Sequence, residues 1–263
     1  MDGKVYAFNG ATGGELWNFP TGAGVFSSPA SKDLDGDLIP DVVVGSRDGN
    51  VYAINGDTGV ELWNFPTTEW VNSSPAIVQL GGDATPDVVI ASLDGNTYAI
   101  NGSTGLQIWM FPTGSYVWTS PAVANLNGDS TPDVILGADS SSVYAINGIN
   151  GALLWEFVSD DRIWSSAAMV EVSGDSVPDA IVGSDDGFLY AIDGSDGSLQ
   201  WMYPTGDWVD SSPAVGDVDN DGFVDVVFGR FDGYVTRLTM VDSPLTIAPW
   251  PMFRHDLSHS GAF

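Results

Sequence analysis

A segment of 46 residues repeats along this chain without a gap. Copies start at Asp2, Asp48, Asp94, Ser140 and Asp186, and a partial sixth copy starts at Asp232. Five copies in one register do not arise by chance, and a period of this length is typical of solenoids and propellers. The fold is therefore expected to be built from one small unit that packs on copies of itself.

Each copy contains four short apolar runs that are separated by turn residues. In the second copy the runs are NVYAIN, VELWNF, SSPAIVQ and PDVVIAS. Their Val, Ile, Tyr and Trp content indicates β-strands, and none has the length or the 3.6-residue period of a helix. The pattern predicts an all-β fold, a β-propeller of four-stranded antiparallel blades with five full repeats and a split or partial sixth blade.

The ends of the chain leave the closure of the propeller open. We expect residues 1–249 to form the propeller and residues 250–263 to form a tail that covers a blade edge. The first two strands and the strand at 234–239 compete for one place in a five-bladed ring. Either the N-terminal strand pair and the tail jointly make a sixth blade that closes the ring within the chain, which we favour, or a neighbouring molecule completes the half-blade in a head-to-tail contact. In the tail, His255, Asp256 and His259 offer an alternative set of metal ligands.

Two segments of the repeat resemble known propeller families. YAINGDTGVELWNF at 52–65 resembles the tryptophan motif of propellers like those of quinoprotein dehydrogenases. SSPAVGDVDNDGFVDVVFG at 211–229 resembles the calcium-binding FG-GAP/VCBS repeat of integrin-like propellers. The resemblance covers residues 2–238 and implies strands A to D from the axis outward, at SSPA, PDVVVGS, VYAIN and ELWNF. It implies a fold and no particular activity, because propellers are scaffolds for many functions.

One tryptophan recurs on each D strand, and its regular spacing predicts that it fills the space between blades. These residues are Trp17, Trp63, Trp109, Trp155 and Trp201. Between strands C and D, the pairs Asn55-Gly56 and Thr58-Gly59 predict a turn with residues at positive φ.

The loop between strands A and B is rich in acidic residues. Alternating aspartates resemble the start of the D-x-D-x-D-G calcium loop, and the FG-GAP resemblance implies that this loop binds Ca²⁺ between two strands. Ca²⁺ takes six to eight oxygen ligands, and without a cation so many carboxylates would repel one another. The alternative is that the aspartates only cap turns. The predicted ligands in the first, third, fourth and fifth loops are Asp33, Asp35, Asp37, Asp41, Asn125, Asn127, Asp129, Asp133, Glu171, Asp175, Asp179, Asp217, Asp219, Asp221 and Asp225.

The loop between strands D and A varies most among the copies. In a propeller these loops surround the mouth of the central channel, on the face opposite the acidic loops. Aromatic and polar side chains together suit the recognition of a protein or a glycan, whereas the alternative is that the rings plug the channel. The candidate binding residues are Trp70, Tyr116, Trp118, Arg162, Trp164 and Trp208.

The composition excludes several classes of function. A formal net charge of −28 argues against nucleic acid and anionic lipid as partners. The chain has no cysteine, which excludes disulfides and thiol chemistry, and no apolar run that suits membrane insertion. The first residues do not form a signal-peptide pattern, so we expect the signal of a secreted protein to lie outside this chain.

Catalysis finds little support, because few Lys or Arg residues are present to hold an anionic quinone and both histidines lie in the tail. We therefore expect a non-catalytic, calcium-stabilised β-propeller at the cell surface or outside the cell, acting as a binding or adhesion module. The alternatives are a structural subunit of an extracellular assembly or filament, joined through half-blade completion, and a polysaccharide-active enzyme or its accessory module.

Overall fold

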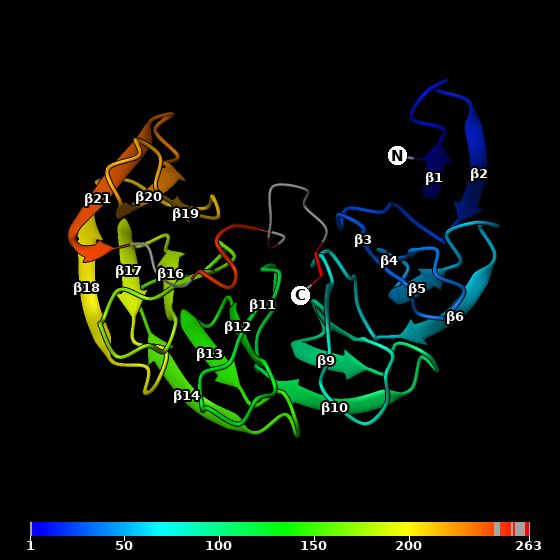
Figure 1. Cartoon of the computed structure of the whole chain (residues 1–263), viewed down its shortest axis with the longest axis horizontal. Helices are drawn as coiled ribbons and strands as arrows, with labels where there is room; N and C mark the ends of the chain where they lie inside the picture. The colour runs from blue at the N-terminus through cyan, green and yellow to red at the C-terminus, as the bar shows by residue number, and fades with distance from the viewer. Residues whose placement is uncertain (1, 245–247, 254, 256–260, 263) are drawn as a thin grey trace.

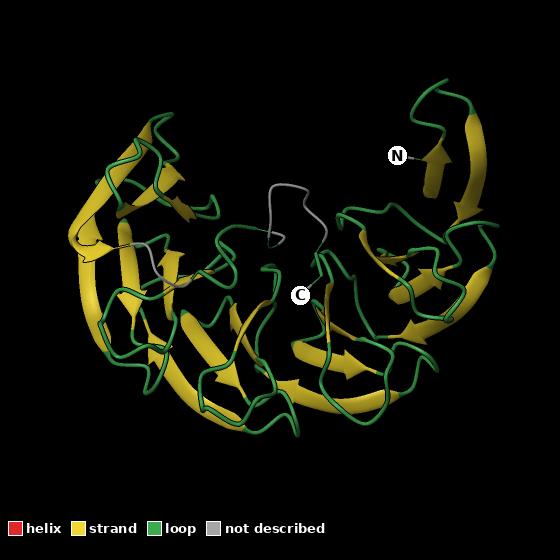
Figure 2. Ribbon diagram, in the orientation of Figure 1, coloured by secondary structure: helices red, strands yellow, loops and turns green. Residues whose placement is uncertain are grey.

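The computed structural model describes residues 2–244, 248–253, 255 and 261–262. These residues form small β-sheets that are arranged around a central axis as an open arc (Figure 1). Strands and loops account for this part of the chain (Figure 2), and none of its segments is a helix long and apolar enough to cross a bilayer. The prediction of an all-β propeller with four-stranded antiparallel blades is confirmed.

Four sheets are complete blades, and their strands follow one another from the axis outward. Two of them comprise β3 (Ala30–Lys32), β4 (Asp41–Gly45), β5 (Asn50–Ile54) and β6 (Glu61–Pro66), and β7 (Ala76–Val78), β8 (Asp87–Ala91), β9 (Asn96–Ile100) and β10 (Gln107–Pro112). The other two comprise β11 (Ala122–Ala124), β12 (Asp133–Gly137), β13 (Ser142–Ile146) and β14 (Leu153–Val158), and β15 (Ala168–Val170), β16 (Asp179–Gly183), β17 (Phe188–Ile192) and β18 (Leu199–Pro204).

The two ends of the chain form incomplete sheets. β1 (Lys4–Phe8) pairs with β2 (Glu15–Pro20), and β19 (Ala214–Gly216), β20 (Phe223–Gly229) and β21 (Val235–Pro244) form a three-stranded sheet. These two sheets do not pair with each other within the described residues, and they lie at opposite ends of the arc (Figure 1). Among the described residues the sheet of β1 and β2 has two strands and gains none from the tail, so the favoured closure by a sixth blade made from the N-terminal pair and the tail is wrong. Each end brings its own C strand, β1 or β21, so the two ends do not merge into one four-stranded sheet.

The inner strands of the blades are buried on both faces, because each complete sheet packs between two neighbours. Every residue of β8, β12 and β16 is buried, whereas the outer strand β14 buries only its tryptophan fully. This packing explains why the B and C strands read as continuous apolar runs rather than as alternating patterns.

The recurring tryptophan of each D strand joins one blade to the next. The Trp17 Nε1 donates a hydrogen bond to the Gly56 carbonyl of the following blade at 2.8 Å. Three further copies make the same bond, at 2.6 to 2.8 Å, through Trp63, Trp109 and Trp155. Each of these four rings also contacts a turn glycine, since a Cβ on Gly59 would lie 2.7 Å from the Trp17 ring.

The C–D turn uses its two glycines for different reasons, which corrects the expectation of positive φ at both pairs. Gly59 has a φ of +70°, but Asn55 and Gly56 do not adopt positive φ. Gly56 is needed because a Cβ there would lie 2.0 Å from the carbonyl oxygen of Pro40. The turn is thus pressed against the A–B loop, where no side chain fits.

The described tail residues lie against the innermost strands. The backbone N–H groups of Met169 and Val215 donate to the carbonyls of Trp250 and Pro251, both at 2.7 Å, and Ile77 donates to Gly261 at 2.7 Å. These bonds satisfy strand edges that face the axis. Asp256 and His259, two of the alternative metal ligands, lie outside the described residues, as do the other tail residues at 254, 257–258, 260 and 263.

Candidate functional site

The acidic-loop face, made of the A–B loops and C–D turns, brings the first three aspartates of the first loop together. Carboxylate oxygens of Asp33, Asp35 and Asp37 lie within 4.8 Å of one another. Asp33 accepts the N–H groups of Gly36 and Leu38 at 2.7 and 2.9 Å, so the loop curls around it. The three side chains are at most half-buried and offer oxygens of the kind that Ca²⁺ prefers.

The fourth aspartate of each loop has a different place. Asp41 is fully buried and accepts the N–H of Leu34 at 2.8 Å and the N–H of Gly56 at 3.0 Å. It therefore ties its own loop to the following C–D turn. Asp133 and Asp179, also predicted as metal ligands, make the same two bonds in their own blades.

Burial affects the acidity of these bridging residues. Loss of solvation raises the pKa of Asp41 and Asp133, and it raises the pKa of Asp87 and Asp179 to about 6. The backbone donors act in the opposite direction, because they favour the ionised form.

The third and fourth loops differ from the first. Asn125, Asn127 and Asp129 keep the curled shape, and each accepts a backbone N–H of the loop at 2.8 to 2.9 Å. In the fourth loop, buried Glu171 accepts the N–H groups of Gly174 and Ser176. Among the described residues, Glu171, Asp175 and Asp179 are not brought together as one acidic cluster.

In the fifth loop, an arginine from the adjacent strand lies beside the acidic residues. Asp217, Asp219 and Asp225 form the second acidic cluster of the described residues, and Asp221 lies outside it. The Arg237 Nη1 on β21 lies 2.7 Å from Asp219 Oδ2 and 3.7 Å from Asp225 Oδ2. This guanidinium already offsets part of the repulsion that a bound ion would relieve.

The opposite face, called the mouth face here, combines each D–A loop with the B–C loop of the same blade. The Asp185 N–H donates to the Arg162 carbonyl at 3.0 Å, and the Phe231 N–H donates to the Trp208 carbonyl at 2.9 Å. The same bond occurs in all five copies and fixes one variable residue of the B–C loop beside the D–A loop. These residues are Arg47, Leu93, Asp139, Asp185 and Phe231.

These five B–C positions are not among the residues predicted from the sequence to form a site. A signal was present, since the position just before the recurring Asp of each copy varies as widely as the D–A positions do. Only the three-dimensional arrangement shows that the two variable positions lie side by side.

The predicted aromatic residues form separate clusters rather than one ring. The Arg47 guanidinium lies 3.3 Å from the Phe26 ring centroid and 4.5 Å from that of Trp70. Trp118 and Trp164 lie 6.1 Å apart between centroids. Trp208 pairs with Phe231 at 5.4 Å.

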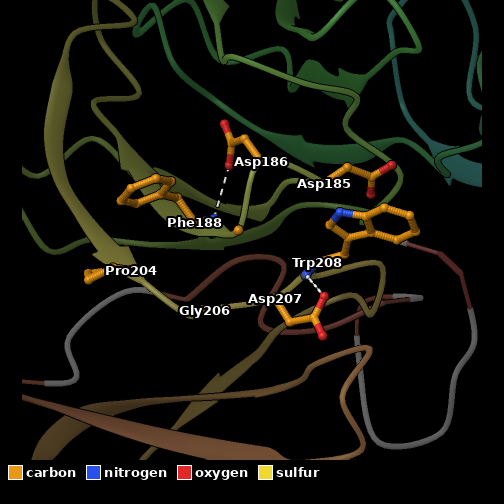
Figure 3. Close-up of a pocket in the computed structure, with 8 residues that line it drawn as sticks. Asp185, Asp186, Phe188, Pro204, Gly206, Asp207 and Trp208 are labelled. Atoms are coloured by element: carbon orange, nitrogen blue, oxygen red, sulfur yellow. Dashed lines mark hydrogen bonds between the residues drawn. The ribbon is translucent and has the colours of Figure 1, made fainter.

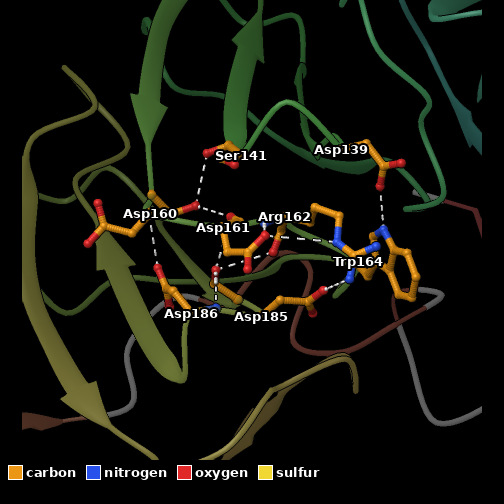
Figure 4. A network of polar contacts seen from close by, with 10 residues as sticks. Asp139, Ser141, Asp160, Asp161, Arg162, Trp164, Asp185 and Asp186 are labelled. Carbon is orange, nitrogen blue, oxygen red and sulfur yellow. Dashed lines mark hydrogen bonds and ion pairs between the residues drawn. The ribbon is translucent and has the colours of Figure 1, made fainter.

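Two further contacts organise the cluster around Trp164, as Figure 4 shows. The Trp164 Nε1 donates a short hydrogen bond to Asp139 Oδ1. Arg162 packs over the Trp164 ring at 4.3 Å, and its Nη2 lies 2.8 Å from Asp185 Oδ2. Arg162 thus lies between an aromatic face and a buried carboxylate.

Asp185 is only 4% exposed, and its carboxyl group interacts directly with that of Asp210. Neither Asp185 Oδ1 nor Asp210 Oδ1 has a hydrogen-bond donor among the described residues. Burial and the neighbouring Asp210 raise the pKa of Asp185 to about 6, against the opposing effect of Arg162.

Pockets open on both sides of this carboxylate pair. Asp185 and Trp208 lie at one pocket of about 330 Å³ (Figure 3). Asp210, Trp118 and Trp164 line another of about 260 Å³. Tyr116 lies apart from both and lines a pocket of about 250 Å³ with Gly95 and Gly114.

The repeat is similar to one protein family and to several solved structures. A family model described as outer membrane protein assembly factor BamB matches residues 1–162 and 80–235. The crystal structure of BamB from Moraxella catarrhalis superposes with a TM-score of 0.68 at 16% identity, over 92% of this chain and 66% of that chain. Saccharomyces cerevisiae Sqt1 gives a TM-score of 0.71 at 22% identity, over 94% of this chain and 68% of that chain.

A computationally designed protein, Ika8, gives a TM-score of 0.66 at 20% identity, over 94% of this chain and 68% of its own. Identities this low show the fold alone. None of the curated proteins matches this chain by sequence.

Proposed function

The chain belongs to the family described as outer membrane protein assembly factor BamB, and from this premise we propose that it is a non-catalytic scaffold that binds a protein partner at its mouth face. One observation carries the proposal: exposed aromatic side chains gather at positions that differ among the copies. Trp70 is 44% exposed, Tyr116 57% and Trp208 44%. Exposed rings of this kind bury large apolar areas when a partner docks.

A protein suits this face better than a glycan does. The aromatic residues form separate clusters, each combined with its own charged or polar group, and such spacing fits an extended surface with several contact points. The family name, which refers to the assembly of outer membrane proteins, supports the same choice, and we keep the cell surface or the exterior of the cell as the proposed location.

We further propose that Ca²⁺ stabilises the acidic-loop face, first of all through Asp33, Asp35 and Asp37. These residues offer converging carboxylate oxygens, and no Lys or Arg makes an ion pair with them in the described part of the chain. The ion would supply charge neutralisation and loop rigidity, and no chemistry. In the fifth loop Arg237 competes for the same oxygens, so we expect weaker binding there.

Self-association head to tail is a second candidate, because both ends of the arc leave a strand with a free edge. Among the residues that the structure describes, β21 pairs only with β20, and β1 pairs only with β2. Tyr234 and Val235, at the start of β21, are 64% and 76% exposed. Size-exclusion chromatography with light scattering at several protein concentrations tests this, and a monomer at all of them contradicts it.

The partner-binding proposal is tested by affinity capture from an envelope extract of the source organism, with a glycan array in parallel. The test variant carries Trp70→Ala, Trp118→Ala and Trp208→Ala. The control carries Val60→Ala, Leu106→Ala and Ile149→Ala, which are 62%, 68% and 51% exposed on the C–D turns of the opposite face. We expect the wild type and the control to retain the same proteins and the test variant to lose them. Equal retention by all three, or glycan binding without protein capture, overturns the proposal.

A further inference from the structure

A repeated contact across the blade boundary singles out one position on the mouth face. The variable B–C residue of one blade meets the D–A residue 25 positions later, in the next blade. The Arg47 Nε donates to Asn72 Oδ1 at 3.0 Å, and the Trp164 Nε1 donates to Asp139 Oδ1. In each of these pairs a donor faces an acceptor.

The pair of Asp185 and Asp210 occupies the same place one blade further on and breaks this rule. Two carboxyl groups meet there. Both oxygens of Asp185 and Oδ1 of Asp210 accept no hydrogen bond among the described residues, although Arg162 forms an ion pair with Asp185 Oδ2. Only 4% of Asp185 is exposed, so bulk water does not solvate its carboxyl group. A buried acceptor without a donor is costly, and here the single guanidinium of Arg162 faces two carboxyl groups.

The surroundings of this pair suit an organic cation. Asp210 lines the pocket of about 260 Å³ together with Trp118 and Trp164, and aromatic faces attract guanidinium and ammonium groups. Arg162 already binds in this manner, 4.3 Å from the Trp164 ring centroid and 2.8 Å from Asp185 Oδ2 (Figure 4). It is one cation among the carboxylates of Asp139, Asp161, Asp185 and Asp210.

We propose that the pocket between Trp118, Trp164 and Asp210 binds an arginine or lysine side chain of the protein partner, with Asp210 as its counter-ion. This inference rests on the proposed function and names the chemistry of the contact. A divalent ion fits less well, because Ca²⁺ needs six to eight oxygens and two indole rings occupy much of the pocket wall.

The test uses a short peptide as probe, acetyl-Gly-Arg-Gly-amide, on the full chain. The matched probe carries citrulline in place of arginine and has the same shape without the charge. Binding is followed through the indole ¹⁵N–¹H signals, with Trp118→Phe and Trp164→Phe variants to assign them. We expect the arginine peptide to shift both signals at pH 8 and the citrulline peptide to shift neither.

Asp210→Asn is the decisive variant, and Asp57→Asn, an exposed residue on the opposite face, is its control for the loss of one charge. We expect Asp210→Asn to lower the affinity for the arginine peptide about tenfold or more, because one charge-assisted contact is lost. Asp57→Asn should leave the affinity unchanged. The melting temperature of Asp210→Asn should not fall, since the substitution also removes repulsion, so weaker binding is not explained by misfolding.

Three results overturn the inference: equal binding of both peptides, equal affinity of Asp210→Asn and the wild type, or displacement of the arginine peptide by Ca²⁺ at this pocket. They leave the proposed function standing if the triple tryptophan variant still loses its captured proteins. If no protein is captured by the wild type, the proposed function fails, and the peptide titration still tests the pocket independently.

Discussion

Buried aspartates occur on both loop faces, but their carboxyl groups have different partners on the two faces. On the acidic-loop face Asp133 is fully buried and accepts the N–H groups of Leu126 and Gly148 at 2.9 and 3.1 Å. On the mouth face Asp185 is almost as deeply buried, yet it meets a second carboxyl group, and neither of its oxygens accepts a hydrogen bond among the described residues. A buried aspartate thus joins the A–B loop to the C–D turn on the acidic-loop face, whereas on the mouth face it lies beside a second carboxyl group.

This difference separates the residues that build the fold from those available for recognition. The bridging aspartate recurs in every complete blade because the loop and the turn cannot be joined without it. The mouth positions change from copy to copy, so they do not serve the repeat. In a repeat protein the positions shared by all copies supply the stability, so the variable positions can carry unfavourable contacts where a partner binds.

The largest effect is expected from Gly148→Ala, which separates the turn from the bridging aspartate. A Cβ at Gly148 would lie 1.9 Å from the carbonyl oxygen of Pro132, a backbone atom that cannot move aside alone. We expect a loss of about 4 kcal/mol or more in the free energy of unfolding, measured by chemical denaturation. Gly128→Ala is the control: it has a φ of +76° but nothing within 4 Å of its Cβ, so only about 1 kcal/mol should be lost. Equal losses would show that close approach is not what the turn requires.

The next effect concerns the bridging aspartate itself. Asp133→Ala leaves the buried N–H groups of Leu126 and Gly148 without an acceptor, at a cost of about 2 to 3 kcal/mol. Asp210→Ala on the mouth face should cost less than about 0.5 kcal/mol or stabilise the protein, because it relieves repulsion. Urea denaturation at pH 8 measures both, and equal destabilisation would remove the contrast between the faces.

The next prediction concerns the effect of bound Ca²⁺ on the stability of the acidic-loop face. At about 100-fold over its dissociation constant, a bound ion adds about 2.7 kcal/mol per site. We expect the melting temperature to rise with Ca²⁺ and to fall with chelator, and we expect a variant with Asp33→Asn, Asp35→Asn and Asp37→Asn to lose most of this response. Calorimetric titration of Ca²⁺ counts the sites. A wild type that melts identically in both buffers has no stabilising calcium site.

A smaller effect is expected from pH at the mouth face. Burial and Asp210 raise the pKa of Asp185 from 3.8 to about 6, while Arg162 opposes the rise and Asp161 adds to it. The folded state therefore holds this proton more tightly than the unfolded state, and its contribution to stability is present below about pH 4 and lost as the pH rises through about 6.

Asp185→Asn removes this dependence. Its free energy of unfolding relative to the wild type should increase between pH 4 and pH 7, by on the order of 1 to 2 kcal/mol. Taking the difference cancels the titration of Asp87 and Asp179, whose pKa values are also about 6. A difference that does not change with pH would show that Asp185 titrates normally.

Much of the fold was predictable because the same pattern of apolar runs and turn residues recurs in every copy of the repeat. Strand positions and the inter-blade tryptophans follow from apolar runs and turn residues that recur at one period, and the order A to D from the axis outward follows from the resemblance to known propeller families. The closure of the ring was not predictable in this way. It depends on how β1 and β21 are placed relative to each other, and a local pattern carries no information on that distance.

The candidate sites were predictable in part. Alternating aspartates indicate the first acidic cluster, but the sequence does not distinguish Asp41, which is buried and bridges to Gly56, from the loop aspartates before it. Nor does it show that Arg237 would enter the fifth loop. The meeting of Asp185 and Asp210 joins two blades across 25 positions, so only the packing of one blade on the next reveals it.

The most direct test of the central claim is a double-mutant cycle for Asp185 and Asp210, measured by chemical denaturation at pH 8, above the Asp185 pKa of about 6. If the two carboxylates repel, each single alanine substitution relieves the same repulsion, so the two single effects should sum to about 1 kcal/mol more stability than the double variant shows. Additive effects, or a coupling of the opposite sign, would contradict the account.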